Sequence, residues 1–120
     1  MPSQGTVTRN AQQPVIRIST GHFSPDRFDE VKRLLEESAV PLTPAILGLG
    51  GLLYYHVGVD SKTSTLVNVS IWKTEADAKQ MDTLAAMLAQ RPVLEGAGVR
   101  FEVIVNYLPL WKIEAGWPTS

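Results

Sequence analysis

The sequence contains no cysteine, only two histidines and no long apolar run among its 120 residues. The absence of cysteine excludes disulfides, thiolate nucleophiles and Cys-based metal sites. Two histidines without nearby acidic residues fall short of a facial triad or a zinc ligand set, so we expect no metal site. No segment approaches the roughly 18–20 apolar residues that cross a bilayer, and the N-terminus lacks the apolar region of a signal peptide. We therefore expect a cytoplasmic protein with no membrane partner.

Neither sign of charge dominates the chain. Eleven Lys and Arg stand against twelve Asp and Glu, which gives a formal net charge of −1. Because these charges are spread without blocks, the sequence predicts no nucleic-acid partner. The length fits one compact domain. We expect a disordered polar leader at residues 1–13, the domain at 14–108, and a C-terminal extension at 109–120 that packs on the domain or on a dimer partner.

The expected elements follow the order strand, helix, strand, strand, helix, strand. The first helix opens at Ser24 and Pro25, and Pro41 and Pro44 are expected to end it. The second helix follows Thr74, the first residue of a capping box, and is expected to stop before Pro92. The expected strands are Val15–Thr20, Leu52–Asp60, Leu66–Lys73 and Arg100–Leu108. This βαββαβ order predicts a ferredoxin-like α+β fold, an antiparallel sheet with two main helices.

Side-chain alternation separates an apolar face of the sheet from a mixed face. In the third strand Val67, Val69 and Ile71 form a purely apolar set, whereas the opposite set includes Asn68 and Ser70. The hairpin register that sets apolar sides together places His56 opposite Asn68 and Tyr54 opposite Ser70. In the fourth strand, the same alternation sets Phe101 on one side and its even-numbered neighbours on the other.

Two helices can cover only one face of a four-stranded sheet. The other face would then expose more apolar area than the few hundred Å² that monomers tolerate. A second copy of the chain is the simplest cover, so the sequence predicts a symmetric homodimer in which two sheets face each other.

His22 and Trp72 each end a central strand directly before a helix. If the first and third strands are adjacent and parallel, as we expect, these two side chains meet at one edge of the sheet. Two helix N-termini would converge there and favour a small, flat or anionic ligand. Asn68 lies on the same face as Trp72, with His56 across from it.

The segment Asn68–Ala78, NVSIWKTEADA, resembles the antibiotic biosynthesis monooxygenase superfamily, in which the third strand ends in tryptophan and a Trp-x-Ser/Thr-Glu helix opening follows. Gly51 resembles the glycine that starts the second strand in that family, and the resemblance spans residues 14–108. It implies a dimeric α+β barrel. The family includes cofactor-free, quinone-forming oxygenases, haem-degrading enzymes and members without a known activity. Residues 75–91 contain no histidine, where the haem-degrading branch carries its ligand.

The resemblance implies a cofactor-independent monooxygenase that acts on a small aromatic or quinol-type compound. Asn68 would bind a substrate oxygen, and Trp72 would stack on the ring. Either histidine would assist deprotonation, because an imidazole titrates near neutral pH. The candidate residues are Asn68, Trp72, His22 and His56 as catalytic groups, and Tyr54 and Ser70 as substrate-pocket residues.

The alternative is a non-catalytic dimeric α+β barrel that binds a small ligand or acts as a subunit. Asn68 and His56 would then pair with each other, and no cavity would remain. Trp72 would be a core residue that joins strand to helix, since aromatic side chains dominate core burial. Both histidines would be satisfied structural residues.

Overall fold

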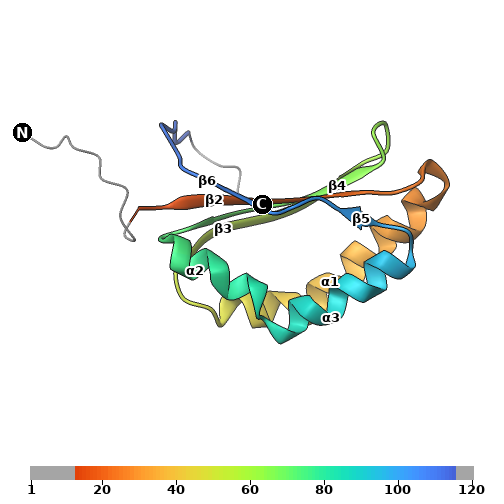
Figure 1. Ribbon diagram of the computed structural model, residues 1–120, viewed down its shortest axis with the longest axis horizontal. Coiled ribbons are helices and arrows are strands. Elements are labelled where there is room, and N and C mark those ends of the chain that lie inside the picture. The colour runs from red at the N-terminus through yellow and green to blue at the C-terminus, as the bar shows by residue number, and fades with distance from the viewer. Residues whose placement is uncertain (1–12, 116–120) are drawn as a thin grey trace, which may run out of the picture.

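The computed structural model describes residues 13–115, which build a five-stranded sheet with helices against it (Figure 1). The strand order is β3-β4-β2-β5, with β6 also paired to β2, and every pairing is antiparallel. The strands are β2 (Val15–His22), β3 (Leu52–Asp60), β4 (Thr65–Trp72), β5 (Arg100–Phe101) and β6 (Val105–Tyr107). The helices are α1 (Phe28–Leu47), α2 (Glu75–Lys79) and α3 (Ala85–Gly96), with short 3₁₀ turns at Pro25–Arg27 and Gln80–Asp82.

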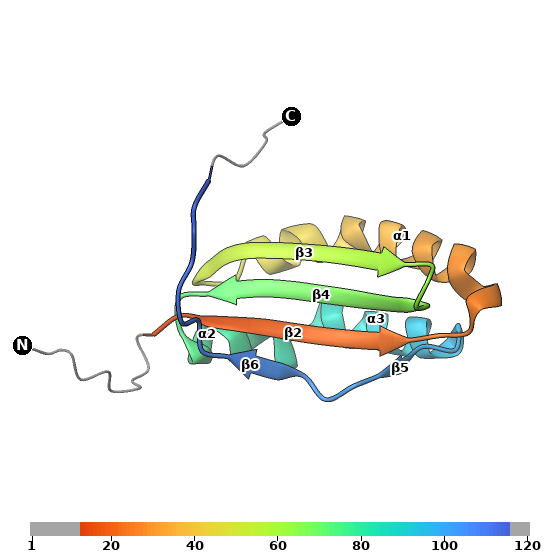
Figure 2. The ribbon, with the colours of Figure 1, turned by 90° about the horizontal axis from the view of Figure 1, so that it is seen from above.

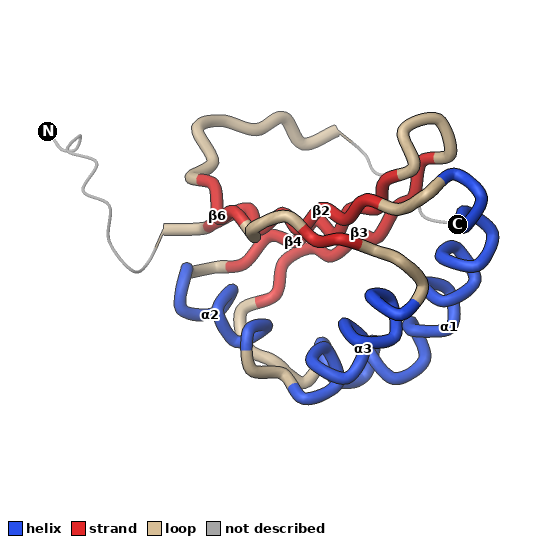
Figure 3. The backbone as a smooth tube through the Cα atoms, turned by 45° about the vertical axis from the view of Figure 1, so that its right-hand side comes forward, coloured by secondary structure: helices blue, strands red, loops and turns tan. Residues whose placement is uncertain are grey.

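The predicted α+β class and ferredoxin-like element order are confirmed. Residues 1–12 of the expected leader and residues 116–120 of the expected extension lie outside the described residues. Among residues 13–115, no helix has both the length and the apolar character needed to cross a membrane. All three helices lie against the same side of the sheet (Figure 3).

The first helix is longer than the prolines suggested. Pro25 lies in the first turn as expected, and the rings of Phe23 and Phe28 are 6.4 Å apart. The predicted Ser24 cap was wrong, because its side chain makes no capping hydrogen bond and a 3₁₀ turn precedes α1. The helix then continues through Pro41 and Pro44 to Leu47, so the predicted end was wrong. Both prolines are exposed. The carbonyls that lose their helical partners therefore lie on the solvent side, where water can bind them.

The second helix is divided. Thr74 caps it as predicted, with Oγ1 accepting a hydrogen bond from the Asp77 backbone N–H at 3.0 Å. A 3₁₀ turn then separates α2 from α3, and α3 passes through the exposed Pro92 to Gly96, so the predicted stop before that proline was wrong. Proline again lies on an outward position, where the lost hydrogen bond is replaced by solvent.

The first and third strands, β2 and β4, are adjacent and central as expected, but they are antiparallel. The reason is the chain path: β3 runs parallel to β2 after the α1 crossover, and the hairpin then reverses β4. His22 therefore pairs with Thr65 and Trp72 with Val15, at opposite ends of the sheet. The predicted meeting of His22 and Trp72 at one edge was wrong.

The hairpin register also differs from the prediction by one residue. Leu52 pairs with Trp72, but a β-bulge follows, and from Tyr54 onward each residue of β3 is shifted. His56 consequently faces Val69 rather than Asn68. A one-residue slip moves every side chain to the other face. Tyr55, and not His56 or Tyr54, therefore points to the same side as Asn68 and Ser70.

The expected fourth strand is interrupted between β5 and β6. Phe101 pairs with Gly21 and Val105 with Ile18, which belong to opposite faces of β2. The predicted single alternation through Arg100–Leu108 was therefore wrong. The irregular stretch brings Ile104 to the helix side, where it lines a cavity, while Val103 is 87% exposed.

The two faces of the sheet differ sharply. The inner face, which the helices cover, has an apolar cluster at each end: one contains Val15 and Trp72, the other Leu66. Between these clusters it carries the polar side chains of Arg17, Ser19, Tyr55, Asn68, Ser70 and Asn106. The outer face is mainly apolar at its centre and consists of Ile16, Ile18, Tyr54, His56, Val67, Val69, Ile71, Val105 and Tyr107.

The segment after β6 crosses over one end of the outer face (Figure 2). It borders a cleft of about 620 Å³ together with Ile16, Tyr54 and Ile71. Its large apolar side chains are more exposed than buried: Leu110, Trp111 and Ile113 are about 80% exposed (83%, 79% and 81%).

Candidate functional site

A cavity of about 160 Å³ lies between the polar centre of the inner face and the helical segment from Met81 to Leu94. A smaller space of about 50 Å³ adjoins it and shares Arg17, Ser19 and Asn68 with it. The helices contribute Met81 and Met87 to both spaces. Methionine adapts its shape to irregular surfaces, so this wall suits a flat apolar group. The combination of polar floor and apolar wall is typical of a small-molecule site.

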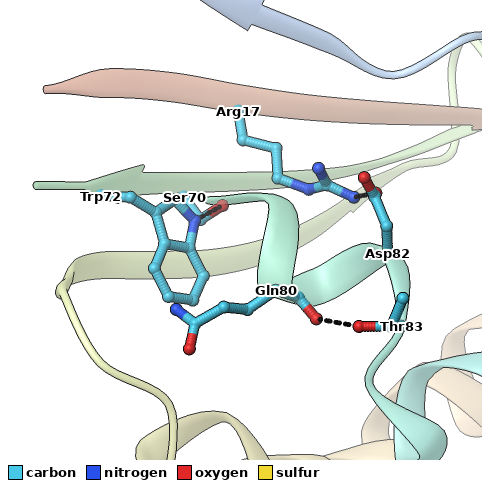
Figure 4. Close-up of polar contacts among 6 residues, drawn as sticks. All are labelled: Arg17, Ser70, Trp72, Gln80, Asp82 and Thr83. Atoms are coloured by element: carbon cyan, nitrogen blue, oxygen red, sulfur yellow. Dashed lines mark hydrogen bonds and ion pairs between the residues drawn. The ribbon is translucent and has the colours of Figure 1, made fainter. Parts of the chain in front are cut away.

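Arg17 is the most unusual residue of this cavity. It lies in the middle of the central strand β2, and its side chain is only 8% exposed. Its Nη2 donates to Oδ1 of Asp82 at 2.8 Å, and Asp82 is 51% exposed (Figure 4). A guanidinium carries five N–H donors. Among residues 13–115, no second hydrogen bond of this side chain is seen, so most of its donor capacity is available to a ligand.

Asn68 lines both spaces from the centre of β4, next to Ser19 on β2. A carboxamide in a strand interior usually has a hydrogen-bond partner. Within the described part of the chain, the Asn68 side chain makes no such bond. Its pairing with His56 is ruled out, because the two side chains lie on opposite faces of the sheet. The amide is thus positioned to bind a ligand oxygen.

Tyr55 reaches the smaller space from β3 and was not among the predicted site residues. Burial raises the pKa of its hydroxyl above the ordinary value of 10.0, and the positive charge of Arg17 lowers that pKa by a smaller amount. The hydroxyl is therefore protonated at neutral pH and can donate a hydrogen bond. Tyr55 also lines an apolar groove of about 370 Å³ between α1 and β3, so its ring separates that groove from the smaller space.

Ser70 lines the smaller space, whereas Trp72 lines neither space. The Trp72 side chain is fully buried in an apolar cluster, and its Nε1 donates to Ser70 Oγ at 2.8 Å (Figure 4). The predicted arrangement with the indole stacked on a ligand is absent from this geometry. Trp72 instead fixes the position of Ser70 at the edge of the cavity.

Neither histidine contributes to the cavity. His22 lies at the far end of β2, where Nε2 is 2.5 Å from a carboxylate oxygen of Glu102. His56 stacks on Tyr54 with ring centroids 4.4 Å apart, and both rings belong to the outer face. The expected closeness of His56, Tyr54 and Asn68 was wrong, and the cause is the one-residue shift of β3.

Sequence reasoning missed Arg17, Tyr55 and Asp82. A signal for Arg17 was present, because a charged residue interrupts the apolar run Val15-Ile16-Arg17-Ile18 of a central strand. Charged residues are rarely buried unless they are paired. The face on which Tyr55 lies depends on the hairpin register, which was predicted one residue off. Asp82 lies in a 3₁₀ turn, whereas the sequence predicted a continuous helix there. Among the residues that the structure describes, no group of three or more acidic or histidine side chains could hold a metal ion.

Comparison with solved structures finds many proteins with the same architecture. A putative antibiotic biosynthesis monooxygenase from Deinococcus radiodurans is 20% identical, with a TM-score of 0.65 over 86% of this chain and 99% of that one. A putative antibiotic biosynthesis monooxygenase from Nitrosomonas europaea is 15% identical, with a TM-score of 0.65 over 88% and 97%. SnoaB, a cofactor-independent oxygenase from Streptomyces nogalater, is 13% identical, with a TM-score of 0.60 over 86% and 99%.

The chain has the fold of these proteins. The resemblance that the hairpin motif indicated is therefore confirmed at the level of the fold. No protein-family model matches the sequence, and no curated protein matches it. On the antibiotic biosynthesis monooxygenase fold seen here, the cavity between sheet and helices is formed mainly by side chains of β2, β4 and the segment 81–94.

Proposed function

We propose that the protein is a cofactor-independent monooxygenase that acts on a small aromatic or quinol-type compound. The observation that carries this proposal is the Asn68 amide, which borders the cavity without a hydrogen-bond partner among the described residues, beside the buried cation Arg17. The fold shared with SnoaB, which is a cofactor-independent oxygenase, supports the same reaction class.

The proposed reaction needs no external reductant. An ionised hydroxyaromatic ring transfers an electron to O₂, and the two radicals combine to form a C–O bond at a ring carbon. The O–O bond of this peroxide then breaks as that carbon loses its proton, which leaves a quinone carbonyl and water. One phenol and one O₂ thus give one quinone and one water, and O₂ takes all four electrons from the substrate.

Each residue of the cavity has a defined part in this scheme. The Asn68 amide and the Tyr55 hydroxyl donate hydrogen bonds to substrate oxygens and orient the ring. Asp82 is the carboxylate that borders the cavity and can accept the phenolic proton. Preorganised donors of this kind stabilise charge that develops in a transition state. His22 and His56 remain untested as bases, and either would have to act from outside this cavity.

Oxygen consumption by the full chain, with phenol and its methyl- and hydroxy-substituted derivatives and a metal chelator present, tests the proposal. We expect one O₂ consumed per quinone formed and no hydrogen peroxide, which separates the reaction from simple autoxidation. Asn68→Ala should lower kcat about 100-fold, the usual loss for one such donor. Glu37→Ala, on an exposed part of α1, is the control. Equal rates for Asn68→Ala and the parent would contradict the assignment.

One observation favours a second function, ligand binding without turnover. The cavity of about 160 Å³ is smaller than the roughly 300 Å³ of a usual ligand site, and it contains no histidine. A protein of this kind would bind phenols with a measurable dissociation constant, consume no oxygen and release no quinone. The same oxygen measurement therefore separates the two functions.

We also infer that a second copy of the chain covers the outer face. The support is the unbroken apolar centre of that face, from Ile16 and Ile18 to Val69, together with the exposed side chains after β6. Exposed apolar area of this extent is uncommon on a monomer. Light scattering on the full chain at micromolar concentration should give twice the 13.2 kDa mass of the chain. A monomeric mass would contradict the inference.

A further inference from the structure

We propose that the cavity takes single-ring hydroxyaromatic compounds in their ionised form, with the oxyanion bound to the guanidinium of Arg17 and Asp82 acting as the counter-ion that the ligand replaces. The inference deepens the proposed function and rests on the same cavity. Its test, however, measures binding alone and does not depend on turnover.

The first support is the burial of Arg17. A buried charge requires compensation, because removal from water is unfavourable for an ion. Arg17 is 92% buried by its side chain, yet it has one visible ionic partner, Asp82, through a single nitrogen. The guanidinium fork can bind two oxygens side by side. The donors that Asp82 leaves unused border the space that Asn68 and Ser19 also line.

The second support is the asymmetry of the ion pair. Arg17 is held in the central strand of the sheet, whereas Asp82 lies in a short 3₁₀ turn and is half exposed. An exposed carboxylate can exchange its partner for water at little free-energy cost. An incoming oxyanion can therefore replace Asp82 while Arg17 stays in place.

The third support is size. A dry apolar cavity of about 150 Å³ accommodates benzene, so the space of about 160 Å³ fits one six-membered ring. The adjoining 50 Å³ bordered by Tyr55 and Ser70 has room for one small substituent. A fused second ring would extend beyond this volume toward the open side of the cavity. Tyr55 lines both this space and the larger groove between α1 and β3, so its side chain lies at the border between them.

The charges around Arg17 agree with this assignment. Arg91 also borders the cavity, where its guanidinium lies 5.2 Å from the centre of the Phe101 ring, and Nε bonds Glu95. The charged side chains that line the cavity are thus those of Arg17, Arg91 and Asp82. With Asp82 displaced, the cavity wall is positive and selects for an anion.

The experiment is a titration of 4-nitrophenol against the full chain, because its ionised form is coloured. The parent should bind the phenolate at least ~10-fold more tightly than the phenol, which lowers the apparent pKa of the bound dye by about one unit. Arg17→Met should remove this preference, and Arg17→Lys should retain part of it. Arg33→Met, on an exposed part of α1, should leave it unchanged.

Asp82→Asn keeps the proposal testable if Arg17→Met does not fold. In this variant Arg17 lacks its counter-ion and should bind the phenolate more tightly. If the ion pair were purely structural, its loss would weaken the binding of phenol and phenolate alike or leave both unchanged. Equal binding of phenol and phenolate by the parent, or of 1-naphthol and phenol, would overturn the inference. Anion binding without oxygen consumption would leave this inference standing and reject the proposed oxygenase.

Discussion

The inner face of the sheet is polar at its centre although the helices cover it, whereas the outer face is apolar although none of the described helices covers it. On the inner face the polar strip from Arg17 to Asn68 separates two apolar clusters. On the outer face Ile18 and Val69 stand next to each other on neighbouring strands. Stability alone would favour the reverse arrangement, because burial of polar groups costs free energy and burial of apolar groups gains it. The proposed ligand would account for the inner strip, and the proposed second copy of the chain for the outer face.

The largest expected effect is a loss of stability at the end of the inner face where Trp72 is buried. Trp72→Ala should lower the free energy of unfolding by about 3–5 kcal/mol, because a fully buried indole leaves a cavity and Ser70 loses its hydrogen bond. Urea unfolding followed by circular dichroism measures it. Val40→Ala is the control, on α1 where the side chain is 78% exposed, and should cost less than about 1 kcal/mol. Similar losses for both variants would mean that Trp72 does not anchor this end of the inner face.

The next effect concerns the outer face. Val69→Asp places a charge at its centre, which would be buried and unpaired between two copies of the sheet. The dimer dissociation constant should rise ~100-fold or more, since about 3 kcal/mol corresponds to such a factor. Sedimentation velocity measures it. Val40→Asp, at a position on α1 that is 78% exposed, should leave the mass unchanged. A Val69→Asp protein that is still dimeric would show that the copies associate elsewhere.

Neighbouring residues of β3 allow a finer comparison, because Tyr55 points inward and His56 outward. Tyr55→Ala should join the cavity to the groove between α1 and β3 and let 1-naphthol bind as tightly as phenol. His56→Ala should leave this ligand-size preference unchanged. Fluorescence titrations with the two phenols measure it. A preference that changes in His56→Ala alone would mean that the outer residue controls the cavity.

The smallest effect is a pH dependence. Burial raises the pKa of Tyr55 above 10.0, so the folded state holds its proton at a pH where the unfolded chain has released it. The unfolded state then binds fewer protons, and stability must fall as pH rises from about 10 through the raised pKa. Tyr55→Phe should flatten this decline in urea unfolding between pH 8 and 11. An equally steep decline in the variant would assign it to other groups.

Local signals predicted the helix entries and the element order well. Thr74 and Pro25 act within one turn of the chain, so their effect on structure can be inferred without tertiary context. The prolines at 41, 44 and 92 misled because their effect depends on which side of the helix faces water. That side is set by packing that involves Leu42 and Ile46, which is not a local property.

The site was predicted only in part for a related reason. The prediction that Asn68 and Ser70 share one face is confirmed, because both belong to one strand whose alternation is unbroken. Tyr55 and His56 exchanged faces because Asp60 pairs with Thr65, one residue further along β4 than the predicted register requires, and the bulge between Leu52 and Tyr54 restores the predicted pairing only at Leu52; neither strand alone reveals this. Arg17 and Asp82 are 65 residues apart, and their contact requires the complete fold.

The turn of the hairpin controls the chemistry of the distant cavity. Asp60 accepts hydrogen bonds from the backbone N–H and the hydroxyl of Thr63, and Asp60 pairs with Thr65, which sets the register of β3. A turn shorter by one residue would slide β3 along β4 and turn His56 toward the cavity in place of Tyr55. Insertions or deletions in this surface turn would thus exchange a phenol for an imidazole in the cavity wall without any substitution there.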